Sequence, residues 1–210
     1  MIQLYDYELS SSCYKVRLFL NILKLDYEIV PIGFYPAEEH KKPNFLAINP
    51  LGQLPVLKDG DLLLRDSQAI LIYLANQYDK GLNWYSDCPK TIGQIAMWLS
   101  FAGGQIMNAS AARLHDVLRH DYDIDKTRSA AHNALVVLDD HLAEQTLQGE
   151  DWIVGNKPTI ADIACFPCIA LSNDGGIERD EYPAVERWLN NVSRLDGFIG
   201  MPGVLSPYSG

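Results

Sequence analysis

The chain has 210 residues, of which 48% are hydrophobic and 21% are charged, and its formal net charge is -10 at pH 7. A chain of this length can bury a substantial core, either as one large domain or as two small ones. The acidic balance argues against general binding to nucleic acid, because that affinity depends on clustered Lys and Arg that neutralise phosphates. We therefore expect no nucleic-acid partner.

No apolar run approaches the roughly 18 to 20 residues that cross a bilayer, and the N-terminal MIQLYDYE carries acids where a signal peptide carries Lys or Arg. We expect a cytoplasmic protein without a membrane partner. The four cysteines are too few and too unevenly placed for a disulfide framework, so we expect reduced thiols. The five histidines show no metal-binding spacing, and we expect no metal.

The first 78 residues alternate short strand-like runs with helical runs. In chain order, the patterns predict a strand at IQLYDY (2–7), a helix over 12–24, a strand at YEIVPI (27–32) and a short helical or irregular piece at KKPNFLAI (41–48). Two apolar runs in LPVLKDGDLLLR (54–65) then flank the turn dipeptide Asp-Gly and predict a hairpin.

The next helix is predicted over DSQAILIYLANQY (66–78), where Asp66 or Ser67 can cap it. The order is therefore β-α-β, a connecting piece, and β-β-α, which is the thioredoxin-like arrangement. Residues 79–88, DKGLNWYSDC, have no periodicity and are typical of a surface linker. Pro89 favours the first position of a helix, and strand signals vanish after it.

Beyond the linker we expect helices at about 90–120, 124–147, 159–172 and 183–194. Gly103-Gly104 interrupts the first of these and predicts a bend, or a close approach by a ligand. Thr159 and Asp162 have the spacing of a capping box at the start of the third.

Four blocks of sequence carry a resemblance to a known family. They are SSSCYKVR (10–17), NPLGQLPVL (49–57), DSQAILIYL (66–74) and GNKPTIADIA (155–164). In this order and spacing, they resemble the cytosolic glutathione S-transferase superfamily, in particular its serine-type bacterial, theta-like, zeta-like and nu-like branches.

The resemblance covers essentially the whole chain and implies an α/β plus all-α fold. A thioredoxin-like β-α-β-α-β-β-α domain that binds glutathione is expected over 1–78. The linker occupies 79–88, and an all-helical domain over 89–210 supplies the electrophile site.

The function that the resemblance implies is that of a glutathione S-transferase, which activates the thiol of its co-substrate glutathione as a thiolate for attack on a small electrophile. Its members are usually homodimers, and Tyr73, Trp98 and the helix after Pro89 are candidates for that contact. Other glutathione-dependent chemistry stays open at this point: isomerisation, dehalogenation, peroxide reduction, or thiol reduction through Cys13. A non-catalytic adaptor with the same fold is an alternative of a different class.

The resemblance also implies residues that bind glutathione. In the family, the Pro of the QLPVL block is in cis, and the backbone of the preceding residue pairs with the cysteinyl part of glutathione; these positions are Pro55 and Leu54. Asp66 and Ser67 match the pair that holds the γ-glutamyl carboxylate at a helix N-terminus, although Asp66 can also be a simple cap. Gln53 is a further candidate contact.

The glycine carboxylate of glutathione needs a cation, and the nearest cluster is HKK at 40–42. We choose Lys42 from this cluster as the expected partner. Gln105, Met107 and Arg113 are candidates for the electrophile pocket, because they add polar, adaptable and cationic groups to an apolar helical segment.

Ser10 falls where the serine-using branches keep their catalytic hydroxyl, and we expect it to donate a hydrogen bond to the sulfur of glutathione. Ser12 stands where bacterial relatives often have a second donor. Tyr5 and Tyr7 are rivals, because the tyrosine-using branches place a phenol at the end of the first strand. We expect Ser11 or Ser12, rather than Ser10, to cap the following helix.

Cysteine chemistry is the remaining possibility. Cys13 lies at a helix N-terminus, where the pKa of a thiol can be depressed. Ser10 nevertheless replaces the first Cys of a C-x-x-C disulfide exchanger, which favours a transferase. Cys165 and Cys168 also form a C-x-x-C, but in an apolar segment, and we expect two buried small hydrophobic residues there.

Overall fold

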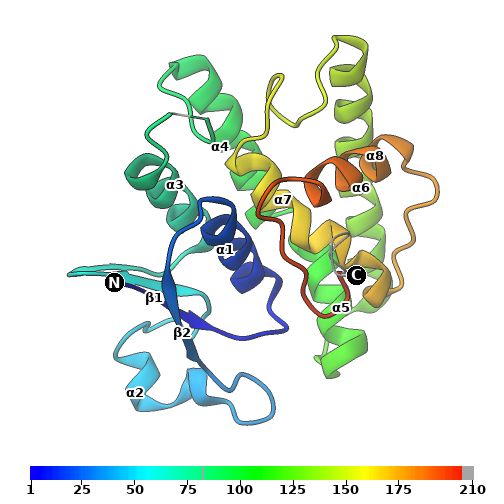
Figure 1. The fold of residues 1–210 in the computed structure, drawn as a ribbon. Coiled ribbons are helices and arrows are strands. Elements are labelled where there is room, and N and C mark those ends of the chain that lie inside the picture. Colours follow the sequence, from blue (N-terminus) through cyan, green and yellow to red (C-terminus); the bar gives the residue numbers. More distant parts are fainter. Residues whose placement is uncertain (82, 205–210) are drawn as a thin grey trace.

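A computed structural model describes residues 1–81 and 83–204 of the chain. A four-stranded sheet with its helices forms the N-terminal part, and helices alone form the rest (Figure 1). Linker residue 82 and residues 205–210 of the expected helical domain lie outside the described residues. The domain limits at 78 and 89 stay a prediction, while the α/β plus all-α architecture is confirmed.

The N-terminal elements follow the expected order. They are β1 (Ile2–Asp6), α1 (Ser11–Ile22), β2 (Tyr27–Pro31), the 3-10 turn η1 (Glu39–Lys41), α2 (Pro43–Leu46), β3 (Val56–Asp59), β4 (Leu62–Leu64) and α3 (Ser67–Tyr78). The strand order is β2-β1-β3-β4, with β1 parallel to β2 and the other pairs antiparallel. Gly60, with a φ of 57°, makes the predicted turn between β3 and β4.

Alternation along β1 determines which helices cover which face of the sheet. Ile2 and Leu4 are buried in the main core with residues of α1 and α3. Tyr5, the residue after Leu4, points to the opposite face of the sheet, where it packs edge-on against Phe45 of α2. The sheet is therefore covered by α1 and α3 on one side and by α2 on the other, as Figure 1 shows.

The second half is helical throughout its described residues. Its elements are α4 (Pro89–Gly103), α5 (Met107–Leu118), α6 (Ile124–Leu147), α7 (Ile160–Ala170), the 3-10 turn η2 (Ser172–Gly175) and α8 (Pro183–Ser193). The segment predicted as one helix over 90–120 is two helices, because the backbone of Gly104 leaves helical geometry (φ -114°, ψ -90°). Among the described residues, no helix is both long enough and apolar enough to span a bilayer.

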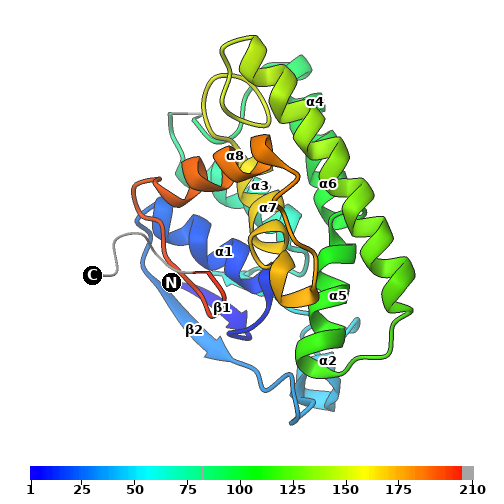
Figure 2. The same ribbon diagram turned by 90° about the vertical axis from the view of Figure 1, so that its right-hand side faces the viewer.

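Helix α7 is the centre of the molecule and joins its two halves. Residues Ile160 to Ile169 are all buried, and α7 contacts α1 and α3 as well as α4, α5 and α8 (Figures 1 and 2). Cys165 and Cys168 are both buried within this helix, as expected for small packed residues. The two domains therefore share one continuous apolar core.

Asp162 organises the start of α7 as the predicted capping box. Its carboxylate accepts hydrogen bonds from the Thr159 N–H at 2.8 Å and from the Ile153 N–H at 3.0 Å. It also accepts from the indole N–H of Trp188, at 2.8 Å, which ties α7 to α8. The Asp162 side chain is fully buried, so each of these donors has exchanged water for the carboxylate.

The connecting segments are also fixed to the core. The buried Asp79 carboxylate accepts from the backbone N–H groups of Gly81, Asn83 and Trp84, and so organises the linker. At the other end of the chain, the Tyr14 hydroxyl donates to the Ile199 carbonyl at 2.6 Å. The segment after α8 consequently lies along α1, as Figure 2 shows.

We predict that Asp162→Ala lowers the free energy of unfolding by about 3–5 kcal/mol, because several buried donors lose their acceptor at once. Denaturant unfolding followed by far-UV circular dichroism measures this loss. The exposed Asp151 provides the control, since Asp151→Ala removes the same charge with an effect within about 0.5 kcal/mol. Equal effects of the two substitutions would contradict the prediction.

Candidate active site

A cleft of about 390 Å³ lies where the two domains meet. Its walls come from the β1–α1 loop and the start of α1, the segment before β3, the start of α3, and α4 and α5. The N-termini of α1 and α3 both face it, and helix N-termini present free N–H groups and a positive dipole end. Pockets between domains with a few convergent polar groups are the usual place for a small-molecule site.

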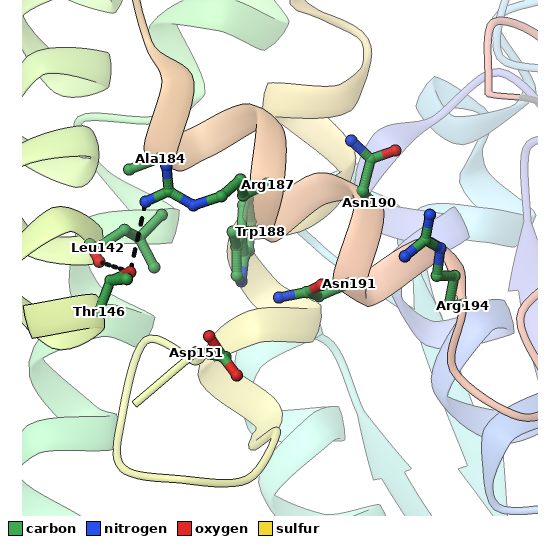
Figure 3. Close-up of a pocket in the computed structure, with 9 residues that line it drawn as sticks. All are labelled: Leu142, Thr146, Asp151, Ala184, Arg187, Trp188, Asn190, Asn191 and Arg194. Carbon is green, nitrogen blue, oxygen red and sulfur yellow. Dashed lines mark hydrogen bonds between the residues drawn. The ribbon is translucent and has the colours of Figure 1, made fainter. Parts of the chain in front are cut away.

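A second hollow, of about 430 Å³, lies between α6 and α8 (Figure 3). In it Arg187 points to Thr146, to which it donates a hydrogen bond at 3.4 Å, while Asn190 points away. Trp188 is buried and already donates to Asp162. This hollow contains no residue of the predicted site, so we place the candidate site in the cleft between the domains.

The loop that enters the cleft, Tyr7 to Leu9, is held by two buried arginines. From α1, the Arg17 guanidinium donates to the carbonyls of Tyr7 (3.5 Å) and Glu8 (2.9 Å) and pairs with the buried Asp6 carboxylate at 2.5 Å. From α5, Arg113 donates to the carbonyl of Leu9 at 2.8 Å. Both domains therefore fix the backbone that leads into Ser10.

Arg113 is itself oriented by Asp174 of η2, at 3.0 Å. It lines the cleft, but its guanidinium is buried and already bound on two sides. Its geometry is that of a group that positions the loop.

Ser10 is the N-cap of α1, so the prediction that Ser11 or Ser12 caps this helix is wrong. The Ser10 Oγ accepts a hydrogen bond from the Cys13 N–H at 3.2 Å, and its own N–H donates to the Tyr7 carbonyl at 3.0 Å. Ser10 takes this role because the loop turns back at Tyr7, which leaves Ser10 extended (φ -78°, ψ 119°) and Ser11 already helical. The hydroxyl proton of Ser10 remains available to a group in the cleft.

The neighbouring serines differ from Ser10 in their surroundings. Ser12 lines the cleft and is half-buried. Ser11 is buried; its Oγ lies 3.3 Å from the Ser110 Oγ of α5 and accepts from the Cys168 thiol at 3.4 Å. All three serines line the cleft, and Ser11 in addition bridges the two domains.

Cys13 does not have the low-pKa thiol that its place at a helix N-terminus allowed. It is fully buried and does not line the cleft. Burial raises the pKa of its thiol to about 12, and the nearby Asp6 carboxylate adds to the shift. The helix dipole stabilises the thiolate less than desolvation destabilises it here, so the thiol pKa rises.

The two rival tyrosines are separated by the alternation of β1. Tyr5 packs against Phe45 of α2 and does not line the cleft. Tyr7 does line it, and its ring packs against that of Phe34, with 5.5 Å between ring centres. Burial raises the pKa of the Tyr7 phenol, so it stays protonated at neutral pH.

The segment before β3 forms the opposite wall of the cleft, and Gln53, Leu54 and Pro55 all line it. The Leu54-Pro55 peptide bond is cis, as the resemblance implied. Buried Asn49 holds this segment: its side-chain amide donates to the Gln53 carbonyl at 2.8 Å, and its Oδ1 accepts from the Leu51 N–H at 3.1 Å.

The start of α3 brings Asp66 and Ser67 into the same cleft. Asp66 is the N-cap, and its carboxylate accepts from the Ala69 N–H at 2.9 Å. Ser67 is buried and donates to the Gln68 Oε1 at 2.6 Å. The capping role and a role toward a ligand are compatible, because Asp66 stays exposed with a second carboxylate oxygen.

Two predicted site residues lie elsewhere. Lys42 precedes α2 and is largely exposed, 4.0 Å from the Glu39 carboxylate; it borders a separate hollow with Phe45. Lys42 lies away from the cleft because it directly precedes α2, which covers the other face of the sheet. Gln105 is exposed in the turn between α4 and α5 and also does not line the cleft, whereas Met107, one helical half-turn further on, does.

Several residues that line the cleft were not predicted as site residues: Leu9, Phe34, Arg65, Gln68, Ser110 and Leu114. Phe34 also stacks on the buried His40, with 3.9 Å between ring centres. At Gly103, where the sequence predicted a bend or a close approach by a ligand, the neighbour is a protein side chain: a Cβ there would lie 3.0 Å from the Gln68 side chain. The close approach is by α3 of the other domain.

Comparison with protein families agrees with this geometry. Residues 4–81 match the model of the glutathione S-transferase N-terminal domain, and residues 117–196 match that of the C-terminal domain. The chain belongs to the cytosolic glutathione S-transferase superfamily. Within the described residues, no three His, Cys, Asp or Glu side chains gather as a metal ion would require.

Individual relatives of this glutathione S-transferase family member are distant but full-length. Glutathione S-transferase F13 of Arabidopsis thaliana is 28% identical over 97% of this chain and 96% of its own. Maleylacetoacetate isomerase of Pseudomonas aeruginosa is 28% identical over 89% of this chain and 88% of its own.

Solved structures in the family superpose closely. A glutathione S-transferase from Xanthobacter autotrophicus Py2 covers 99% of this chain, and 97% of its own length is covered, with 28% identity and a TM-score of 0.84. Ure2p in complex with glutathione covers 93% of this chain, and 95% of its own, with 27% identity and a TM-score of 0.83. The superposition supports the observed arrangement of both domains.

We predict that alkylation of the native protein at pH 8 modifies Cys88 and spares Cys13. Cys88 is exposed, and hydrogen bonds from Thr91 lower the pKa of its thiol. With a pKa of about 12, only about one Cys13 thiol in ten thousand is ionised at pH 8. Iodoacetamide treatment followed by peptide mass spectrometry measures both sites.

Cys88→Ser is the matched control, since this variant should take up almost no reagent until it is unfolded. Modification of Cys13 in the native protein at the rate of Cys88 would contradict the burial of Cys13.

Proposed function

We propose that this protein is a glutathione transferase, in which the cleft binds glutathione and Ser10 stabilises its thiolate. The sulfur would accept a hydrogen bond from the Ser10 hydroxyl, which favours the thiolate over the thiol. The thiol proton leaves to solvent, and the thiolate forms a carbon–sulfur bond to an electrophile held beside it. In a substitution, the leaving group departs with its bonding electron pair.

The orientation of Ser10 is the observation that carries this proposal. Its Oγ accepts from the Cys13 N–H, so that bond does not use the hydroxyl proton, and Ser10 lines the cleft, where this proton can be donated to a ligand sulfur. The alternatives are weaker: Tyr5 lies on the other face of the sheet, and Cys13 is buried with a raised pKa. Ser12 and Tyr7 line the cleft and stay possible second donors.

The rest of the tripeptide would extend across the opposite wall. The Leu54 backbone would pair with the cysteinyl backbone, in the manner of an added strand, with Gln53 beside it. The γ-glutamyl carboxylate would lie at the N-terminus of α3 near Ser67, while the Asp66 carboxylate would accept from the γ-glutamyl ammonium. Among the described lining residues, Arg65 and Arg113 are the cations.

The electrophile would lie on the helical side of the sulfur, between the rings of Tyr7 and Phe34 and the apolar side chains of Met107 and Leu114. Arg113 is already paired with Asp174, so it offers little free charge to this pocket. An uncharged, largely apolar electrophile suits such walls best. Isomerisation of a bound substrate is the second candidate activity, because one full-length relative is a maleylacetoacetate isomerase.

We also propose a cytoplasmic homodimer. Met97 on α4 and Val136 and Val137 on α6 are about half exposed, and these helices meet where Trp98 contacts His141. Exposed apolar side chains on these two helices suit contact with a second copy of the chain. Trp98 itself is buried inside the chain, so it supports this face from behind and does not form the contact surface.

Ser10→Ala should raise the thiol pKa of bound glutathione by about one to two units, because a hydrogen bond to the thiolate is lost. Ultraviolet titration of the complex, which follows thiolate absorbance, measures this pKa. In the parent it should lie well below the value of about 8.5 of an ordinary thiol. Conjugating activity at pH 6.5 should fall about tenfold or more in the variant.

Ser12→Ala is the control, because it removes another hydroxyl from the same cleft, two residues after Ser10. We expect a smaller shift of the glutathione thiol pKa in this variant. An unchanged thiol pKa in Ser10→Ala would remove Ser10 from the proposal and leave Tyr7 or Ser12. Absence of glutathione binding by the parent would favour a non-catalytic member of the family.

A further inference from the structure

Lys15, on the buried side of α1, is a charged side chain that the proposed mechanism does not yet use. It is completely buried, although lysine is among the residues most rarely found so. Within residues 1–81 and 83–204, its ammonium has one hydrogen-bond partner, the Ser67 Oγ at 3.5 Å, and no carboxylate within 4.0 Å. A buried cation without an ion-pair partner costs stability.

Among the residues that the structure describes, no neighbouring group supplies the missing negative charge. Cys165 of α7 is close enough to sense the ammonium, but burial raises the pKa of its thiol, and the thiol stays neutral. The acids of the same core are already engaged elsewhere: Asp162 by its capping partners and Asp6 by Arg17. The charge of Lys15 therefore remains uncompensated in the unliganded protein.

Ser67 stands between this ammonium and the cleft. Its Oγ accepts from Lys15 and, on the cleft side, donates to the Gln68 Oε1 at 2.6 Å. Because the ammonium has only hydrogens to offer, it directs the lone pair of the hydroxyl inward and the hydroxyl proton outward. A hydroxyl that accepts from a cation is also a stronger donor.

We propose that Lys15 is a positioning residue for the γ-glutamyl carboxylate of glutathione. It orients the Ser67 hydroxyl so that the serine proton is presented to this carboxylate. The carboxylate in turn balances the buried charge of Lys15. Gln68 holds the proton until the ligand replaces it. This inference rests on the proposed function, because it requires glutathione in the cleft. It assigns a role at the γ-glutamyl end of the ligand to Lys15, which lies 52 residues before Ser67 in the chain.

Lys15→Met tests the inference, since methionine removes the charge and keeps an unbranched side chain. Calorimetric titration should show about ten- to a hundredfold weaker glutathione binding, and the KM for glutathione should rise while the KM for the electrophile stays unchanged. Lys15→Arg should restore most of the affinity. Lys58→Met, on the exposed side of β3, controls for the change in net charge and should bind as the parent does.

An analogue without the γ-glutamyl α-carboxylate, γ-aminobutyryl-cysteinyl-glycine, gives the readout that a purely structural role cannot move. It should bind weakly, and equally, to the parent and to Lys15→Met. Ser67→Ala should weaken glutathione binding, and adding Lys15→Met to it should weaken binding no further. The melting temperature of Lys15→Met should equal or exceed that of the parent, because a buried unpaired charge is gone.

Equal losses of affinity for glutathione and for the analogue, or unchanged affinity for both, would overturn the inference. If Lys15→Met does not fold, Ser67→Ala decides, because unchanged glutathione binding in that variant leaves Lys15 no route to the ligand. A parent that does not bind glutathione would instead overturn the proposed function, and this inference with it.

Discussion

The position of Ser10 depends on hydrogen bonds that two buried arginines donate to the backbone carbonyls of the three residues before it. Arg17 binds the carbonyls of Tyr7 and Glu8, and Arg113 binds the carbonyl of Leu9. Hydrogen bonds to three successive carbonyls fix the direction of the backbone that leads into Ser10. One arginine comes from each domain, so both domains contribute to fixing the loop. The shared core around α7 holds the two domains together.

This arrangement also explains how an acidic protein can attract an anionic tripeptide. The chain carries ten net negative charges, yet Arg17, Arg113 and Lys15 are buried behind the walls of the cleft. The N-termini of α1 and α3 add partial positive charge on the same side. These partial charges matter inside the cleft because Arg17 and Arg113 are already paired with Asp6 and Asp174, whereas charges exposed on the surface are screened by solvent and salt.

Local patterns were sufficient for much of the fold. Alternation in IQLYDY, the Asp59-Gly60 turn and the capping box of Thr159 and Asp162 depend on neighbours in the sequence, and each appears as predicted. The cis peptide before Pro55 came from the resemblance. The break between α4 and α5 was detected as a glycine pair, but only the structure shows the Gln68 side chain that needs the space.

The candidate site was harder to predict, because its geometry depends on contacts between distant residues. Nothing local distinguishes Ser10 from Ser11 as a helix cap; the turn held by Arg17 and Arg113 decides. Lys42 looked suitable because it is cationic and near in sequence, but the chain turns it toward Glu39. Lys15 looked like an ordinary helical lysine, and only the packing of α7 and α3 over α1 reveals its burial.

The most direct test of the account is a crystal structure of the protein with glutathione. We predict that the sulfur lies within about 3.5 Å of the Ser10 Oγ, with the γ-glutamyl carboxylate at Ser67 and the arginine-held loop unchanged. A sulfur that instead contacts the Tyr7 hydroxyl, or a glutathione molecule bound outside the cleft between the domains, would contradict it.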